Sequence, residues 1–287
     1  MTYDPFSRCH PAVNLLFFLG AIGFGVVIQH PGYILTGLIA AGIYNLLLDG
    51  QKGILRILSM IPVFAVLSSI NPLFNTRGKT VLFHILGNPY TLEALLHGMA
   101  VSGILILMLL WFSCYSKIMT SDKFLFLFAP LAPSLSMLLV MVLRMIPGFF
   151  RRGRQISNGR TTIGKGTSGS LKETLPESMN RLSALTDWAL EGSIATADSM
   201  NSRGYGAKRR SHFPNYTMTA RDWTLLVLLP VLSAVVLLHG GMEAVYTPEI
   251  AFAGASWGLA AYAGFLLIPS ILHIWEVILW HSFKSRI

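Results

Sequence analysis

The sequence offers few side chains whose types and spacing could do chemistry. Gly159, Gly164 and Lys165 have the G-x-x-x-x-G-K spacing of a loop that binds nucleotide phosphates. Such a loop needs Ser or Thr directly after the lysine to hold Mg²⁺, but this chain has Gly166 there, and Thr167 comes one position late. The preceding stretch is typical of a helix, whereas a phosphate-binding loop follows a strand. We therefore interpret this segment as a flexible basic bend.

Patterns of catalysis and metal binding are also missing from the sequence. It contains neither H-E-x-x-H nor G-x-S-x-G, and no acidic pair of the kind that binds magnesium and a diphosphate. His212, Asp222 and Glu191 are the loose candidates for an acid, a base or a metal ligand, and their spacing supports no site. Cys9 and Cys114 are too few and too far apart for a disulfide framework or a metal site, so we predict free thiols.

The elements that carry these side chains have the composition of a membrane protein. Of the 287 residues, 53% are hydrophobic and 12% are charged, compared with roughly 45–50% and about 25% in soluble domains. Long apolar runs without Asp, Glu, Lys or Arg at their centres predict membrane-spanning helices. The predicted fold class is all-α, a polytopic membrane protein with about six transmembrane helices. The predicted spans are residues 11–28, 33–48, 54–70, 94–115, 223–238 and 250–280, with a loop at 73–91.

The positive charge is concentrated in one part of the chain. The formal net charge is +9, and residues 144–221 alone hold 13 basic and 5 acidic residues, a net charge of +8. Nucleic-acid-binding proteins are also strongly basic, but binding phosphates does not require six apolar segments. The excess of Lys and Arg in cytoplasmic loops of membrane proteins explains the basic block more simply. We therefore predict a lipid bilayer as a partner and no nucleic acid.

Residues 124–145 form one more apolar run, which could span the membrane or lie along its inner face. As a span, this run would place the basic block outside the cell, against the charge bias. Pro130 and Pro133 also interrupt it. We favour a helix along the inner face, which leaves both termini and the basic block in the cytoplasm. The predicted domains are transmembrane helices at 1–121, a cytoplasmic domain of long amphipathic helices at 122–221 and C-terminal transmembrane helices at 222–287.

Residues 176–203 have the pattern of an amphipathic helix. Apolar and small residues recur at three- and four-residue spacing and line one face, so that a second helix could cross it closely. The predicted packing residues are Leu182, Leu185, Ala189, Gly192 and Ala195. Gly204 and Gly206 end this helix, and Arg203 lies in its last turn, where the helix dipole favours a cation.

The end of this predicted helix resembles a known motif. The stretch A-D-S-M-N-S-R-G-Y at residues 197–205 is similar to the A-x-x-M-x-A-R-G-Y pattern of the transmembrane T component of energy-coupling factor (ECF) transporters. Residues 3–14, 71–75 together with 87–89, and 120–123 also resemble stretches of that family. The resemblance covers most of the chain.

This resemblance implies a non-catalytic scaffold subunit in the plasma membrane. In the family, two long coupling helices cross like an X, and their Arg-containing ends dock in grooves of two ABC-type ATPase subunits. A small substrate-binding membrane subunit selects the cargo, a vitamin or a transition-metal ion. The chain itself would hold no cofactor, because ATP binds to the partner subunits.

The docking residues follow from matching the two family motifs to this sequence. The second motif matches Ser202, Arg203 and Gly204, with Ser in place of Ala. The first motif, aligned on its glycine, falls on Ile163 and Gly164 and lacks its arginine. The resemblance therefore implies that an arginine one turn upstream substitutes for it, namely Arg160.

Two other function classes remain open at this point. The main alternative is a membrane-embedded enzyme whose basic cytoplasmic loop binds an anionic substrate. A secondary transporter is disfavoured because such proteins use ionisable groups inside the membrane, and the predicted spans have none at their centres. Activity of the purified single chain would distinguish both alternatives from a scaffold subunit.

Overall fold

A computed structural model describes residues 4–74, 80–85, 88–164, 171–206, 216–240, 244–246, 251–252 and 257–284. The chain divides into two compact units, residues 1–124 with 216–287 and residues 125–215. We refer to them as the bundle unit and the two-helix unit, and describe each by itself.

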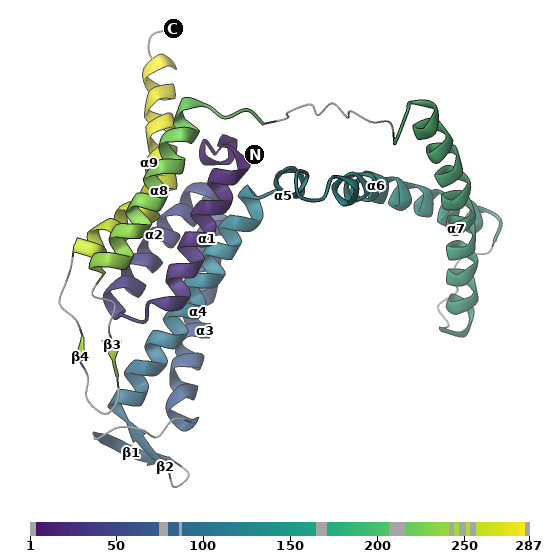
Figure 1. The fold of residues 1–287 in the computed structure, drawn as a ribbon. Coiled ribbons are helices and arrows are strands. Elements are labelled where there is room, and N and C mark those ends of the chain that lie inside the picture. Colours follow the sequence, from purple (N-terminus) through teal and green to yellow (C-terminus); the bar gives the residue numbers. More distant parts are fainter. Residues whose placement is uncertain are drawn as a thin grey trace. The chain divides into compact units, whose positions relative to one another are not determined.

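The bundle unit consists of helices that pack side by side (Figure 1). Helix α2 contacts α3, α4 and α9, while α1 contacts α4 and α8, and α8 contacts α9. A short 3₁₀ turn, Phe6–Arg8, precedes the first helix. The helices of this unit are α1 (Pro11–Val27), α2 (Pro31–Asp49), α3 (Gln51–Phe74), α4 (Leu92–Ile118), α8 (Ala220–His239) and α9 (Trp257–Lys284), with α5 (Ser121–Phe128) beginning at its boundary.

The first two helices begin with the same N-terminal capping arrangement. Each starts with Pro at its first position, where the missing N–H costs nothing. A histidine precedes each proline and caps the helix. The Nδ1 atom of His10 accepts from the Ala12 backbone N–H at 3.2 Å, and that of His30 accepts from Gly32 at 3.1 Å. His-Pro is therefore a helix start in both places.

Within the described residues, six helices are long and apolar enough to cross a membrane. This confirms the predicted all-α polytopic fold, a multi-pass membrane protein. The six differ from the predicted set at two places. Helix α1 has 17 residues, at the lower limit for a span, and α6 joins the group. The six are Pro31–Asp49, Gln51–Phe74, Leu92–Ile118, Pro133–Thr162, Ala220–His239 and Trp257–Trp280.

The region after the third predicted span differs from expectation. We expected Asn71-Pro72 to end the helix at Ile70, but α3 continues to Phe74. Close packing on α4 accounts for the extra turn, because a Cβ atom on Gly98 would lie 2.8 Å from the Ser68 carbonyl oxygen.

The loop predicted at 73–91 is also wrong over part of its length. The strands β1 (Val81–Ile85) and β2 (Asn88–Thr91) pair there as an antiparallel hairpin, with His84 opposite Pro89. A second, shorter pair joins β3 (Ala244–Val245), which lies between the last two predicted spans, to β4 (Ala251–Phe252). Because β4 falls within the range predicted for the last span, the helix there begins only at Trp257.

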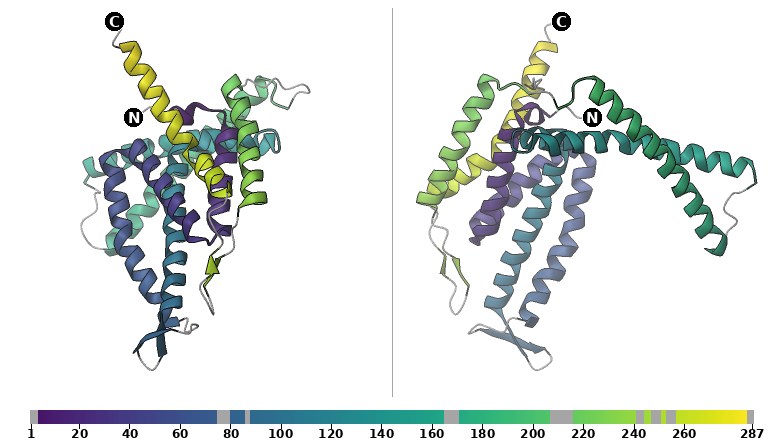
Figure 2. Two further views of the ribbon diagram at one scale, coloured as in Figure 1. Left: turned by 90° about the vertical axis from the view of Figure 1, so that its left-hand side faces the viewer. Right: turned by 45° about the vertical axis from the view of Figure 1, so that its right-hand side comes forward.

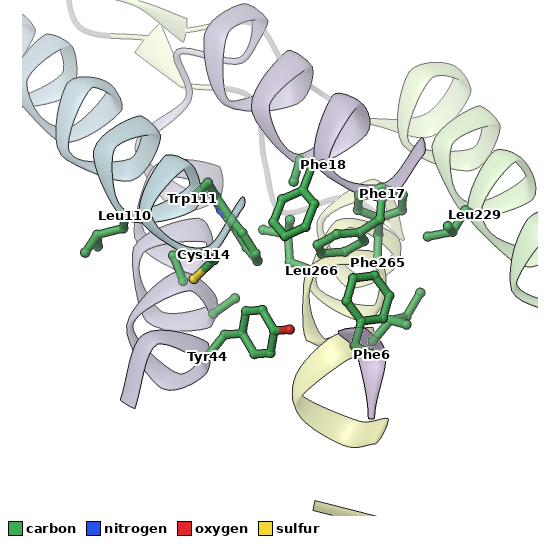
Figure 3. Packing of buried hydrophobic residues seen from close by; sticks show 14 of the residues in the cluster. Phe6, Phe17, Phe18, Tyr44, Leu110, Trp111, Cys114, Leu229, Phe265 and Leu266 are labelled. Atoms are coloured by element: carbon green, nitrogen blue, oxygen red, sulfur yellow. The ribbon is translucent and has the colours of Figure 1, made fainter. Parts of the chain in front are cut away.

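Aromatic side chains fill the core of the bundle unit (Figure 3). Phe17 is fully buried and packs edge-on against Trp111 at 5.4 Å and stacked on Phe265 at 5.3 Å between ring centroids. Inside a bilayer, close packing rather than escape from water holds helices together. These contacts join α1, α4 and α9. Cys9 and Cys114 are buried near this core, and both are free, as predicted.

The N-terminal segment is tied to the bundle by buried polar contacts. Asp4 is 6% exposed and accepts a hydrogen bond of 2.8 Å from the Tyr44 hydroxyl, and it lies 3.0 Å from His273 Nδ1. Lys123 Nζ donates to the Ile118 carbonyl at 2.8 Å and also to Ser7. Because each buried polar group here has a partner, the segment before α1 is part of the folded unit.

Candidate functional site

The two-helix unit contains two long helices that cross, α6 (Pro133–Thr162) and α7 (Leu171–Ser202) (Figure 2, right). At the crossing, Phe149 packs edge-on against Trp188 with ring centroids 5.5 Å apart. The Arg152 guanidinium lies 5.9 Å from the centre of the Trp188 ring. Gly153 faces Leu185, since a Cβ atom on this glycine would lie 3.7 Å from Leu185 Cδ1. An aromatic and aliphatic contact therefore fixes the crossing point.

An ion pair joins the end of α6 to the beginning of α7. The Arg160 guanidinium donates two hydrogen bonds to the Glu177 carboxylate, with Nη2 2.9 Å from Oε2. Arg181, one turn further along α7, lies 3.5 Å from the same carboxylate. The hydrogen bonds from Arg160 hold the pKa of Glu177 below its usual value. The pair fixes the distance between the two helices near their connection.

Helix α7 ends in a Schellman motif built by its sequence. The Gly204 N–H donates to the Asn201 carbonyl at 3.0 Å, and the Tyr205 N–H donates to the Met200 carbonyl at 3.0 Å. This pattern needs a left-handed residue after the last helical turn, and Gly204 supplies it with φ of 78°. Arg203 is the capping residue directly before this glycine.

Helix α6 also ends at a left-handed glycine, with different side chains around it. Gly164 has φ of 77°, and its N–H donates to the Thr161 carbonyl at 3.1 Å. Ile163 takes the place that Arg203 has in α7, and its side chain is 68% exposed. Arg160, the predicted substitute for the missing arginine, is the residue bound to Glu177. The two helix ends thus share a left-handed glycine whose N–H donates to the carbonyl three residues before it, and they differ in charge.

The predicted docking residues at the end of α7 lie on an accessible surface. The Ser202 hydroxyl donates to the Asp198 carbonyl at 2.9 Å, inside the helix. Arg203 is exposed, and its guanidinium has no hydrogen bond or ion pair to any described part of the chain. A free guanidinium at this position can form a bidentate pair with a carboxylate on another molecule.

Only part of the predicted packing face of α7 lies against α6. Leu185 and Ala189 are half-buried at the crossing, and Leu182 is exposed beside it. Further along, Ala195 is exposed, and a Cβ atom on Gly192 would meet nothing within 4 Å. The crossing therefore lies before Gly192, among larger side chains than the small-residue pattern suggested.

Sequence reasoning missed the residues that hold the two helices together. Phe149, Trp188 and Glu177 carry the crossing and the ion pair, yet none was singled out. Trp188 lies one residue before Ala189 on the same amphipathic helix, so a large aromatic beside a predicted packing face was the available signal. The partner of Glu177 lies 17 residues away in another helix, and no local pattern connects them.

The candidates for a catalytic centre do not come together. Asp222 lies in the first turn of α8, in a capping box with Thr219, and it accepts hydrogen bonds from Thr219 and from the His10 backbone N–H at 3.1 Å. Glu191 is exposed on α7, and His212 and Lys165 lie outside the described residues. Among the residues that the structure covers, no group of three or more His, Cys, Asp or Glu could hold a metal ion.

Comparison of the sequence with known protein families and with curated proteins finds no match. The features of the described residues that bear on function are therefore the two helix ends and the crossing of α6 and α7.

Proposed function

We propose that this chain is the transmembrane scaffold and coupling subunit of an ECF-type ABC importer. The observation that carries the proposal is the end of α7, where Arg203 caps the helix with its guanidinium free for a partner. The partners would be two ABC-type ATPase subunits, which bind the ATP, and a small substrate-binding membrane subunit. The plasma membrane, with both termini in the cytoplasm, is the location that this role requires.

The structure of the two-helix unit suits a mechanical role. Gly204 and the Schellman hydrogen bonds give Arg203 a fixed position at the helix end. Helix α7 has 32 residues and is therefore about 48 Å long, long enough to carry a displacement over the width of a subunit. The aromatic crossing and the Arg160–Glu177 pair make α6 and α7 move together. Closure of the ATPases on ATP would shift both helix ends and tilt the substrate-binding subunit.

The test is co-purification of partners with the tagged full chain from its native membranes in mild detergent, followed by mass spectrometry. We expect two ATPase subunits with the wild type and loss of ATPase in Arg203→Glu, because the reversed charge would repel the carboxylate that pairs with Arg203 in the proposed complex. Arg151→Glu is the matched control, since it makes the same charge change at another exposed site of the two-helix unit. We expect it to retain both ATPases.

Other results would contradict the proposal. If Arg203→Glu keeps its ATPases and still supports transport, the α7 end is not the docking site. If the wild type is purified without any ATPase and the single chain is active alone, the membrane-embedded enzyme is the better interpretation.

A further inference from the structure

An apolar groove runs along α6 beside its crossing with α7. Its volume is about 540 Å³, and one of its walls comes from α7 through Leu185. The α6 wall consists of Ile146, Phe149 and Phe150 and, further along the helix, of Arg154 and Ser157. The surface that these residues present to the groove is almost entirely apolar. The groove therefore suits the apolar portion of a ligand, and a charged end would be bound at its edge.

Charged residues are distributed unequally between the two helices that form the groove. Helix α6 contains five arginines and no acidic residue, whereas α7 contains two basic and five acidic residues. A general excess of basic residues in a cytoplasmic loop would not separate the charges by helix. The concentration of cations on α6 indicates that this helix faces an anionic surface.

Three of the five arginines of α6 follow directly after a largely apolar half-helix, which contains one other arginine, Arg144. The first half of α6 exposes large apolar side chains, and Arg151, Arg152 and Arg154 come immediately after it. If α6 crosses the membrane, this order places the guanidinium groups at the level of the lipid headgroups, and if it lies along the inner face, the whole helix is at that level. The exposed apolar side chains of this half are Leu135, Met137, Leu138, Leu139, Val140, Val142, Leu143 and Ile146.

Two of these arginines are available for a ligand. Arg152 stacks on Trp188 and donates to Gln155. Arg151 and Arg154 are exposed and have no hydrogen bond or ion pair to the described residues. They lie three positions apart, on one face of α6. Arg154 is one of the residues that line the groove, and Ser157 lies one turn further along the same wall.

We propose that this groove binds one anionic phospholipid of the surrounding membrane. An acyl chain lies against Ile146, Phe149 and Leu185, and the phosphate is bound at the edge of the groove by the exposed guanidinium of Arg154. The proposal is independent of the importer function, because it concerns only this chain and its bilayer. Cationic pockets of this kind, between helices near the cytoplasmic face, suit anionic headgroups.

The test uses the full chain in nanodiscs that contain equal amounts of phosphatidylglycerol and phosphatidylcholine, with native mass spectrometry of the released protein. We expect the wild type to retain one phosphatidylglycerol in preference to phosphatidylcholine. Arg154→Gln should lower this preference about fivefold, the contribution of one cation near an anionic surface. Gly153→Phe should abolish retention of either lipid, because its side chain fills the groove. Arg203→Gln is the control, since it removes the same charge at the far end of α7.

Three outcomes would overturn the proposal. The first is equal retention of both lipids by the wild type. The second is an equal loss in Arg154→Gln and Arg203→Gln, which would mean that overall charge decides binding. The third concerns a protein occupant, and a photoreactive residue at Phe150 in native membranes detects it. A cross-link to a protein without any lipid adduct would show that another subunit fills the groove.

Discussion

At the scale of single residues, Glu177 has the clearest electrostatic role in the two-helix unit. It accepts two hydrogen bonds from Arg160 and lies close to Arg181, so that one carboxylate contacts two arginines, one from each helix. Because this carboxylate binds Arg160, only Arg203 of the two predicted docking arginines is free for a partner. Arg160 therefore stabilises the two-helix unit and is not available to bind a partner.

This pairing predicts a pH-dependent separation of α6 and α7. The hydrogen bonds from Arg160 lower the pKa of Glu177, so the pair is fully formed above the ordinary glutamate pKa and is lost as the pH falls through the lowered value. Spin labels at Asn158 and Asn180 would measure the distance between the helices. We expect a narrow distribution at pH 7 that broadens in acid, and a broad distribution at both pH values for Glu177→Gln. A distance distribution that is broadened neither by acid nor by Glu177→Gln would contradict this role.

At the scale of elements, the ends of the helices could be predicted better than their contacts. The end of α7 was expected at Arg203 and is found at Ser202, because a left-handed glycine stops a helix through local backbone geometry. The extension of α3 past Pro72 could not be predicted in this way, since packing against Gly98 of α4 decides it. The Arg160–Glu177 pair escaped prediction for the same reason, as it depends on how two helices meet.

The glycine at the end of α7 gives a prediction at this scale. Its φ of 78° costs a residue with a side chain about 1–2 kcal/mol, so Gly204→Val should loosen the Schellman hydrogen bonds. Hydrogen exchange of the Gly204 and Tyr205 region should accelerate about 5- to 30-fold. Gly204→Asn is the control, because asparagine tolerates the left-handed region, and its exchange should stay close to that of the wild type. Equal exchange in Gly204→Val and the wild type would show that this conformation is not held by the glycine.

At the scale of the whole molecule, the N-terminal segment acts as part of the bundle unit. Asp4 joins it to α2 and α9, Lys123 joins it to α4 and α5, and Asp222 joins it to α8. Sequence reasoning placed this segment simply before the first span. Its role was not visible in the sequence because the partners are up to 269 residues away.

The rate at which Cys9 reacts with a thiol reagent measures whether the N-terminal segment stays folded. Burial raises the pKa of its thiol to about 11, so only about 0.1% is thiolate at pH 8. In a Cys114→Ser background, maleimide should label Cys9 very slowly in the folded protein and rapidly after denaturation in sodium dodecyl sulfate. Asp4→Asn should accelerate labelling by weakening the attachment to His273. Rapid labelling of the native protein would mean that the segment detaches without unfolding of the bundle.

The two ends of the crossed helices are alike in backbone and unlike in side chain, with Arg203 on one and Ile163 on the other. If both docking positions accept copies of the same ATPase, the two copies would bind with different strength to a single scaffold. The copy at the α7 end would join first and leave last, so that a complex with one ATPase should accumulate at low ATPase concentration. Assembly would then follow a fixed order, with the first place always on the arginine side.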